Sequence, residues 1–319
     1  MKAIIVQDFG APEVLQIQTV PDPKPDNGEV VVRLHAAGIN PVETYQRTGT
    51  PPYNNTDLPW TPGSDGAGEI VAIGEEVYDW KIGDRVYVYA PKGNGTYAEM
   101  IACRASQVHR LPANVSFEQG AAIGVPYATA HRALFGKAGA KANEVVFIHG
   151  ASGGVGTAAI QLANRAGLTV AGSASDEEFI EKVGAKYTFN HHQDGYISDA
   201  LGATCGRGFD IILEMLANEN LARDPDVLAP FGRIVVIGNR GEATINPRDW
   251  MMKDVTVHGM TLFNVNGAQL QEIHADLVDG LQSGQLRPVI DQSFALADAA
   301  QAHNAVMEGE SHGKIVLKM

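Results

Sequence analysis

Residues 145–156 read Val-Val-Phe-Ile-His-Gly-Ala-Ser-Gly-Gly-Val-Gly, so an apolar run leads directly into a glycine-rich turn. A helix-forming stretch follows at 155–166 and ends before Gly167. Strand, glycine turn and helix in this order predict a βα unit. The helix N-terminus attracts an anion, because it carries partial positive charge and open N–H groups. Glycine lets the backbone approach a pyrophosphate closely, so the turn predicts a dinucleotide-binding domain.

The spacing of these glycines departs from the common G-x-G-x-x-G fingerprint. Gly153 and Gly156 match its last two glycines, whereas Ala151 stands in the first place and Gly150 comes one residue earlier. Glycine-rich turns also occur with a purely structural role. The strand before the turn, the helix after it and a second apolar run at 168–171 favour a mononucleotide-binding βαβ unit.

Length and charge limit the class of protein. The 319 residues predict about two domains, and a net charge of −13 disfavours nucleic acid and anionic membrane surfaces as partners. No apolar stretch approaches the ~20 residues of a transmembrane helix, and the N-terminus has no signal-peptide h-region. Cys103 and Cys205 fit free thiols in a reducing compartment. We therefore expect a cytoplasmic protein.

The pattern along the chain changes near Ser116. Before it the sequence is β-rich, with strands expected at 3–7, 15–20, 29–35, 68–73 and 85–89. After it strands and helices alternate, which predicts a parallel sheet with crossover helices. Strands are expected at 145–149, 168–171, 187–190, 209–214, 233–238 and 255–262, and helices at 155–166, 176–184, 194–201 and 220–229. The tail adds helices at 268–282 and 298–308 and a strand at 314–318, which we expect to rejoin the first domain.

The second strand of the βαβ unit bears on the choice of cofactor. In an NAD site, an Asp or Glu about 20 residues past the glycines binds the ribose 2′-hydroxyl. Ser173 takes that place here, and the acids that follow at 176–178 are better explained by a capping box from Ser175 to Glu178. A neutral strand end leaves room for a 2′-phosphate and favours NADPH over NADH. No Arg or Lys adjoins it, so its charge partner would be Lys182, His191 or Arg240.

Ordered motifs then run along nearly the whole chain. They are 38–45 (GINPVETY), 62–68 (PGSDGAG), 83–86 (GDRV), 120–130 (GAAIGVPYATA), 149–156 (HGASGGVG), 214–220 (EMLANEN), 238–241 (GNRG) and 245–249 (INPRD). Together they resemble the quinone oxidoreductase branch, zeta-crystallin type, of the zinc-independent medium-chain dehydrogenase/reductase superfamily. One departure is Gly150, which stands where the family's A-x-x-G-x-x-G turn has alanine.

This resemblance implies an α/β fold with two domains. A GroES-like, β-rich catalytic domain would comprise 1–118 and 284–319. A Rossmann domain, with a doubly wound parallel sheet that binds NADPH, would comprise 119–283.

The zinc ligands of related dehydrogenases are absent by residue type. At the positions of those zinc ligands this chain has Asn40, Ser64 and the stretch 124–126, which offer neither thiolate nor imidazole. His191 and His192 are adjacent, so on an extended strand they would face opposite ways and share no ion. We expect no metal site.

Without a Lewis acid, conjugated acceptors are the easier substrates, because they are already activated toward hydride. Their oxyanion can be met by a hydrogen-bond donor or by water. The leading prediction is an NADPH-dependent quinone oxidoreductase that reduces a quinone or enone. The alternatives are an enoyl- or 2-alkenal-type reductase and a low-turnover NADPH-binding structural or regulatory protein.

Candidate site residues follow from the motifs and the strand ends. Backbone N–H groups of Ser152, Gly153, Gly154 and Val155 would bind the pyrophosphate, and Gly172 and Ser173 would border the adenosine ribose. His191 would contact the adenosine side, unless it is simply a surface histidine. The nicotinamide half would be lined by Thr129, Asn220, Gly238, Asn239, Arg240, Met260, Thr261 and Leu262.

Two residues of the first domain are the catalytic candidates. Tyr45 could flank the cofactor and Asn40 could donate a hydrogen bond to substrate oxygen. The alternative for both is stabilisation of the loop, since asparagine before proline commonly opens a turn.

The segment 255–262 is rich in β-branched residues and would form an exposed sheet edge, which favours pairing with another copy. Family members pair this edge across a two-fold axis, so the resemblance implies a homodimer or homotetramer.

Overall fold

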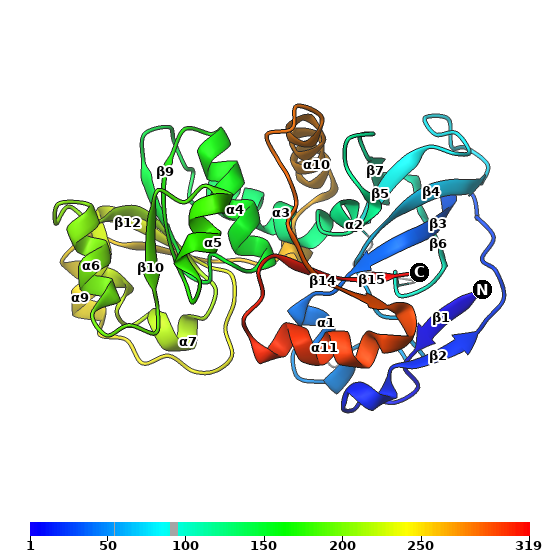
Figure 1. Ribbon diagram of the computed structural model, residues 1–319, viewed down its shortest axis with the longest axis horizontal. Helices are drawn as coiled ribbons and strands as arrows, with labels where there is room; N and C mark the ends of the chain where they lie inside the picture. Colours follow the sequence, from blue (N-terminus) through cyan, green and yellow to red (C-terminus); the bar gives the residue numbers. More distant parts are fainter. Residues whose placement is uncertain (54, 90–94) are drawn as a thin grey trace. The chain divides into compact units, whose positions relative to one another are not determined.

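A computed structural model of the chain describes residues 1–53, 55–89 and 95–319. It divides into two compact units (Figure 1). Unit 1 comprises Met1–Pro126 and His274–Met319, and unit 2 comprises Tyr127–Ile273. The chain thus leaves the first unit, builds the second and returns.

Unit 1 is built on a seven-stranded sheet of order β14-β15-β3-β4-β5-β7, in which β6 also pairs with β3. The strand β3 is central because its run of Val, Leu and Ala is almost wholly buried. The last strand, β15, pairs with β3 and joins Val316 to Gly38, which confirms the expected return of the chain end. The strands of this sheet are β3 (Glu29–Gly38), β4 (Asp65–Ile73), β5 (Arg85–Tyr89), β6 (Met100–Arg104), β7 (Val108–Arg110), β14 (Ile290–Ala295) and β15 (Lys314–Lys318).

Smaller elements complete unit 1. A two-stranded ribbon is formed by β1 (Lys2–Ile5) and β2 (Gln16–Thr19). Its helices are α1 (Pro41–Thr48), α2 (Phe117–Gly120) and α11 (Ala299–Glu308), with 3₁₀ turns at Pro12–Val14, Ala105–Gln107 and Leu296–Asp298. The chain passes from unit 1 to unit 2 within helix α3 (Gly124–His131) and returns to unit 1 within helix α10 (Gly267–Gln282).

Unit 2 is a six-stranded sheet in which every neighbouring pair is parallel, with the order β10-β9-β8-β11-β12-β13. Numbered from its first strand, this is the order 3-2-1-4-5-6 of a doubly wound Rossmann sheet. The strands are β8 (Val145–Ile148), β9 (Thr169–Ala174), β10 (Tyr187–Asn190), β11 (Phe209–Glu214), β12 (Leu228–Val236) and β13 (Thr256–Gly259). The helices are α4 (Gly154–Arg165), α5 (Glu177–Val183), α6 (Tyr196–Ala203), α7 (Ala217–Asn220), α8 (Asp224–Val227) and α9 (Pro247–Met251), with a π turn at Arg132–Lys137 and a 3₁₀ turn at Leu262–Asn264.

Several expected elements are wrong in extent. The helix expected at 220–229 is two short helices, α7 and α8, and β12 already begins at Leu228. Pro225 fits the first turn of α8, but Pro230 cannot extend a helix. The strand expected at 255–262 is only β13, since Leu262 starts a 3₁₀ turn. The cap of α5 is Asp176 rather than Ser175, because the Asp176 side chain accepts the Phe179 N–H.

Three strands were not expected from the sequence, namely β6, β7 and β14. The strand β7 has only three residues, and β14 (IDQSFA) lacks a clear apolar alternation. Such strands depend on pairing with distant neighbours, which local patterns do not report.

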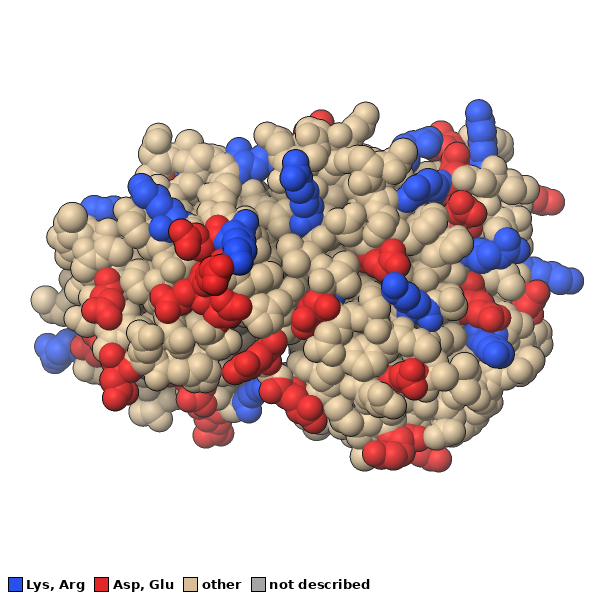
Figure 2. All heavy atoms as spheres, in the orientation of Figure 1, with Lys and Arg blue, Asp and Glu red and all other residues tan. Residues whose placement is uncertain are grey.

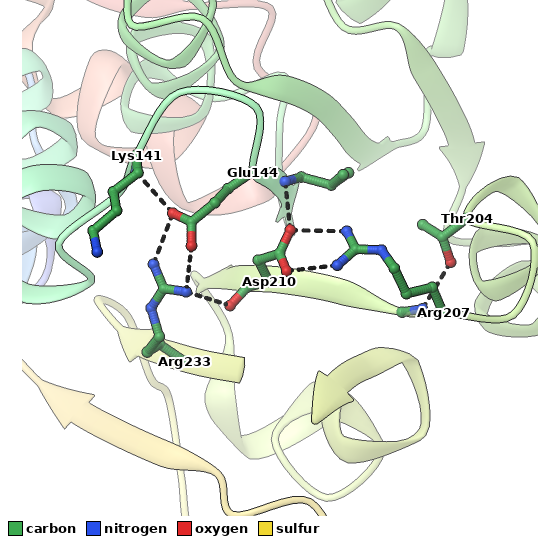
Figure 3. A network of polar contacts seen from close by, with 8 residues as sticks. Lys141, Glu144, Thr204, Arg207, Asp210 and Arg233 are labelled. Carbon is green, nitrogen blue, oxygen red and sulfur yellow. Dashed lines mark hydrogen bonds and ion pairs between the residues drawn. The ribbon is translucent and has the colours of Figure 1, made fainter. Parts of the chain in front are cut away.

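An ion-pair network ties the starts of β8 and β11 to Arg233 within β12 (Figure 3). Arg233 forks onto Glu144 at 2.8 and 2.9 Å, and Arg207 forks onto Asp210 at 2.7 and 2.8 Å. Burial raises the pKa of the Glu144 carboxyl, but the Arg233 fork and the Lys141 N–H lower it, and the net shift is downward. Asp210 also accepts the Val145 N–H, so the network holds the ends of the strands in register.

Charges of both signs are interspersed over the face shown in Figure 2, without a continuous basic field. Within residues 1–53, 55–89 and 95–319, no helix is both long and apolar enough to cross a membrane.

Candidate functional site

The glycine-rich turn lies at the carboxyl end of β8. The strand ends at Ile148 and α4 begins at Gly154. Gly153 is the N-cap of α4 and supplies no side-chain cap. The first three N–H groups of the helix, on Gly154, Val155 and Gly156, therefore have no partner within the helix. Ser152, Gly153, Gly154 and Val155 are half-buried, so this end of α4 can receive an anion.

Close packing explains the glycines of this turn. Gly150 adopts a positive φ of 60°. A Cβ on Gly156 would lie 2.6 Å from the Cα and carbonyl carbon of Ala151. A Cβ on Gly172, in β9, would lie 2.7 Å from the Cβ of Ala151. The turn is thus pressed between α4 and β9, which is the cradle that a pyrophosphate requires.

The residues predicted for the adenosine side do not all lie at the surface. Ser173 is 1% exposed, and its Oγ lies 3.4 Å from His149 Nδ1. Its hydroxyl therefore contacts the interior. His191 is exposed and directly follows β10, the third strand of the unit, and its contact with the adenosine side stays a prediction. Lys182 pairs with Glu178 at 2.6 Å on the exposed face of α5.

Apart from Thr129, the residues predicted for the nicotinamide half follow the carboxyl ends of β11, β12 and β13, so the fold brings them to one edge of the sheet. Asn220 is buried and donates to Glu214 at 3.2 Å. A Cβ on Gly238 would collide with the Met215 carbonyl. Arg132 donates to the Thr261 carbonyl at 2.7 Å.

The other members of this set lie as follows. Asn239 donates to the Gly241 carbonyl at 2.5 Å, and the Arg240 N–H donates to Asn218 at 2.9 Å. The Met260 N–H donates to the Val236 carbonyl at 3.2 Å, and Leu262 starts the 3₁₀ turn that follows β13. Thr129 is buried in α3. Their contacts with a cofactor remain predictions.

A buried triad below the glycine turn was missed at the sequence level. His149, directly after β8, lies 2.9 Å through Nε2 from Asp224 Oδ1 and 3.6 Å from Glu214 Oε2. Burial raises the pKa of Glu214 to about 7 and that of Asp224 to about 7, and it lowers the pKa of His149 to about 4. Near neutral pH these carboxyls therefore exchange between protonated and ionised forms.

In unit 1, Asn40 lies at the centre of a buried polar network. It is 2% exposed, and its Nδ2 donates to Glu43 and to Asp65 at 3.0 Å each. Its Oδ1 accepts a hydrogen bond from the Lys314 ammonium, which also pairs with Asp65 at 3.3 Å. Both amide protons of Asn40 are thus used inside the unit. Donation to substrate, as predicted, would require one of these bonds to break, and the geometry favours a positioning role.

The Lys314 ammonium supplies positive charge to the two buried carboxyl groups of this network, Glu43 and Asp65. Burial raises the pKa of Glu43 and of Asp65, and the nearby Lys314 ammonium opposes both shifts. Glu43 accepts from Tyr97 Oη at 2.7 Å and from the Ser64 N–H at 2.8 Å. Because its partners are donors, the carboxylate form fits the network. Sequence reasoning missed the other members of this network, which are Glu43, Asp65, Tyr97 and Lys314.

Tyr45, the other catalytic candidate, is half-buried on α1. Its ring stacks on Tyr53 with centroids 5.7 Å apart. Burial, and next the neighbouring Tyr45, raises the pKa of the Tyr53 hydroxyl, which keeps it protonated. The two rings form a stacked aromatic surface, whose contact with substrate is a prediction.

Comparisons with known proteins agree with this fold. Residues 26–113 match the family "Alcohol dehydrogenase GroES-like domain", and residues 183–317 match "Zinc-binding dehydrogenase". The chain is 43% identical to human quinone oxidoreductase and 44% identical to the mouse protein, over 99% of this chain and 97% of each relative.

Solved structures are similar over the whole chain. A quinone oxidoreductase from Pseudomonas syringae has a TM-score of 0.88 at 31% identity and covers 100% of this chain and 99% of its own. A mycobacterial protein solved with NADPH has a TM-score of 0.89 at 27% identity, with both chains fully covered. The identity to the quinone oxidoreductases spans both units, so the chain belongs to the quinone oxidoreductase branch of the medium-chain dehydrogenase/reductase superfamily and is an oxidoreductase.

Proposed function

We propose that the protein uses NADPH to reduce a quinone or a conjugated carbonyl compound without a metal ion. The observation that carries the proposal is the uncapped N-terminus of α4 at the carboxyl end of β8, the first strand of a 3-2-1-4-5-6 sheet. Ligands of such sheets bind where the strand order reverses, outside the carboxyl ends. Here that point lies between β8 and β11.

The end of β9 supports NADPH over NADH. The strand ends at Ala174 and offers Ser173 and Ser175 in place of an acid. The next acid, Asp176, is engaged as the N-cap of α5 through the Phe179 N–H at 3.0 Å. The first acid after the strand is thus committed to its own helix rather than to a ribose 2′-hydroxyl, which favours NADPH.

The polar network of unit 1 supports chemistry without a metal. At the places of the zinc ligands in related dehydrogenases this chain has Asn40, Ser64 and the 124–126 stretch, and Lys314 already supplies a cation to Asn40 and Asp65. When bound, NADPH supplies a hydride to a conjugated acceptor, and the acceptor oxygen takes a proton from water. The role of this chain is to bind and orient: amides of the glycine turn hold the diphosphate, and residues after β11 and β12 line the reacting end.

Single-turnover mixing with a panel of acceptors tests the function. Loss of NADPH absorbance with benzoquinones or naphthoquinones, and slower loss with NADH, is the expected result. Faster turnover of 2-alkenals or enoyl thioesters would mean that those compounds, rather than quinones, are the substrates. Tight NADPH binding without oxidation by any acceptor would reject the enzyme and leave a structural or regulatory protein.

We further propose that the protein is at least a homodimer. The last strand of the unit 2 sheet, β13, has no strand of that sheet on its outer side. Phe231, Met251 and Met252 in the same unit are more than 70% exposed, which is unusual for apolar side chains of this size. Light scattering should give at least twice the chain mass of 34.0 kDa. A mass of one chain at micromolar concentration would reject the dimer.

A further inference from the structure

The buried triad joins the carboxyl ends of two strands, β8 and β11, to the start of α8. His149 opens the turn after β8, Glu214 ends β11, and Asp224 starts α8. Ser173 of β9 approaches the other ring nitrogen of His149. All three triad residues are at most 2% exposed. Glu214 Oε2 and Asp224 Oδ2 have no hydrogen-bond partner among the residues that the structure describes.

The groups that face the triad do not neutralise two carboxylates. Arg223, in the connection between α7 and α8, is the cation that acts on His149 and Asp224, but its guanidinium bonds Asn220 at 2.6 Å. Tyr196 of α6 is the other titratable neighbour. Glu214 accepts two hydrogen bonds, from the Leu216 N–H and from Asn220. Two ionised carboxylates in this interior would therefore leave uncompensated negative charge.

A metal ion fits the cluster less well than a proton does. The three ligand atoms lie within 4.8 Å of one another. However, His149 Nε2 and Asp224 Oδ1 are 2.9 Å apart. Tetrahedral ligands bound at 2.0–2.1 Å would be about 3.3 Å apart. The shorter distance is that of a hydrogen bond.

We propose that Glu214 and Asp224 take up a proton when the dinucleotide binds, so that the triad acts as a positioning element that sets how tightly the glycine turn holds the diphosphate. The inference rests on the proposed cofactor site. A diphosphate at the N-terminus of α4 would bring negative charge to the turn that His149 opens, and the two carboxylates that contact this histidine repel that charge. Protonation of one carboxyl oxygen by solvent removes the repulsion. His149, with a pKa lowered by burial, stays neutral throughout this range.

Calorimetric titration of the full-length protein with NADH at pH 7.5, in buffers of different ionisation enthalpy, measures this proton directly. NADH is the probe because phosphate monoesters such as a 2′-phosphate titrate near pH 6 themselves. We expect a net proton uptake, and a Kd that rises about three- to tenfold from pH 6.5 to pH 8.5. Binding without proton uptake would overturn the inference and leave the cofactor site intact. If neither NADH nor NADPH bound, the proposed function would fall as well.

The variant Glu214→Gln/Asp224→Asn keeps the shape of the triad and removes both titrating groups. It should bind NADH with no proton uptake and with a Kd that is flat in pH. The matched control is Asp226→Asn, which makes the same charge change at an exposed position of α8 and should keep the wild-type uptake. Equal uptake in all three proteins would overturn the inference. So would a loss of NADH binding on chelator treatment that Zn²⁺ or Mn²⁺ restores, since a metal would then occupy the triad.

Discussion

Replacing Lys314 with methionine is expected to lower the free energy of unfolding of unit 1 by about 3–5 kcal/mol. The ammonium is 4% exposed and is the cation paired with Asp65, which is itself fully buried. Methionine fills a similar volume but leaves the carboxylates of Glu43 and Asp65 without a counter-charge. Breaking one side of a buried ion pair costs far more than the pair itself contributes. Chemical denaturation followed by the fluorescence of Trp60 and Trp80, which lie in unit 1, measures the loss.

The loss should depend on pH in a defined direction. Burial raises the pKa of Glu43 and of Asp65 in the folded state above the pKa in the unfolded state. Their contribution to stability is therefore lost as the pH rises from the unfolded-state pKa through the folded-state pKa. Without Lys314, which opposes both shifts, the pKa values rise further. The variant should therefore lose more stability at pH 8 than at pH 5.

A matched control separates burial from charge. Lys318→Met removes a lysine of the same strand whose side chain is 53% exposed and whose pair with Glu118 spans 3.2 Å. It should change the free energy of unfolding by about 0.5 kcal/mol or less. Adding Asp65→Asn to Lys314→Met should recover part of the loss, because the two residues are in contact and their effects are not additive. A loss of under 1 kcal/mol in Lys314→Met would contradict the assigned network.

Local patterns predict the βα units of unit 2 because each strand and turn is specified by neighbouring residues. The run 145–148 before the glycines became β8, and the strand expected at 187–190 is β10 to the residue. The doubly wound sheet and the return of β15 to unit 1 then follow from alternation and connection rules.

The buried polar groups could not be predicted in the same way. Asn40, Asp65 and Lys314 come from three distant segments, and a lysine at the start of a strand usually lies at the surface. The only local signal was the Asn40–Glu43 spacing, which forms a capping box at α1. Likewise, nothing near His149 in sequence indicates Asp224, which is 75 residues away.

Ser173 illustrates a different limit. Its position in the motif predicted a residue beside the ribose, yet it is 1% exposed. Parallel sheets are covered on both faces, so almost every residue of β9 is buried up to the strand end. A motif therefore locates the strand end but not the direction of the side chain.

Gly156→Ala is expected to weaken NADPH binding about ten- to a hundredfold. The added Cβ would meet backbone atoms of Gly150 and Ala151, which cannot rotate away as a side chain would. Relief requires the turn to move off α4, and the amides that would hold the diphosphate move with it. Strain of this kind costs about 1–3 kcal/mol, which corresponds to the stated change in Kd. Fluorescence titration of NADPH measures it.

The comparison variant is Gly202→Ala in α6 of the same unit. No heavy atom lies within 4 Å of the Cβ that it adds, and the residue is exposed. It should leave the NADPH affinity unchanged and stabilise the helix by roughly 0.5–1 kcal/mol, since alanine loses less backbone entropy than glycine. Wild-type affinity in Gly156→Ala would mean that the diphosphate does not depend on this turn, and the cofactor site would have to lie elsewhere on the sheet.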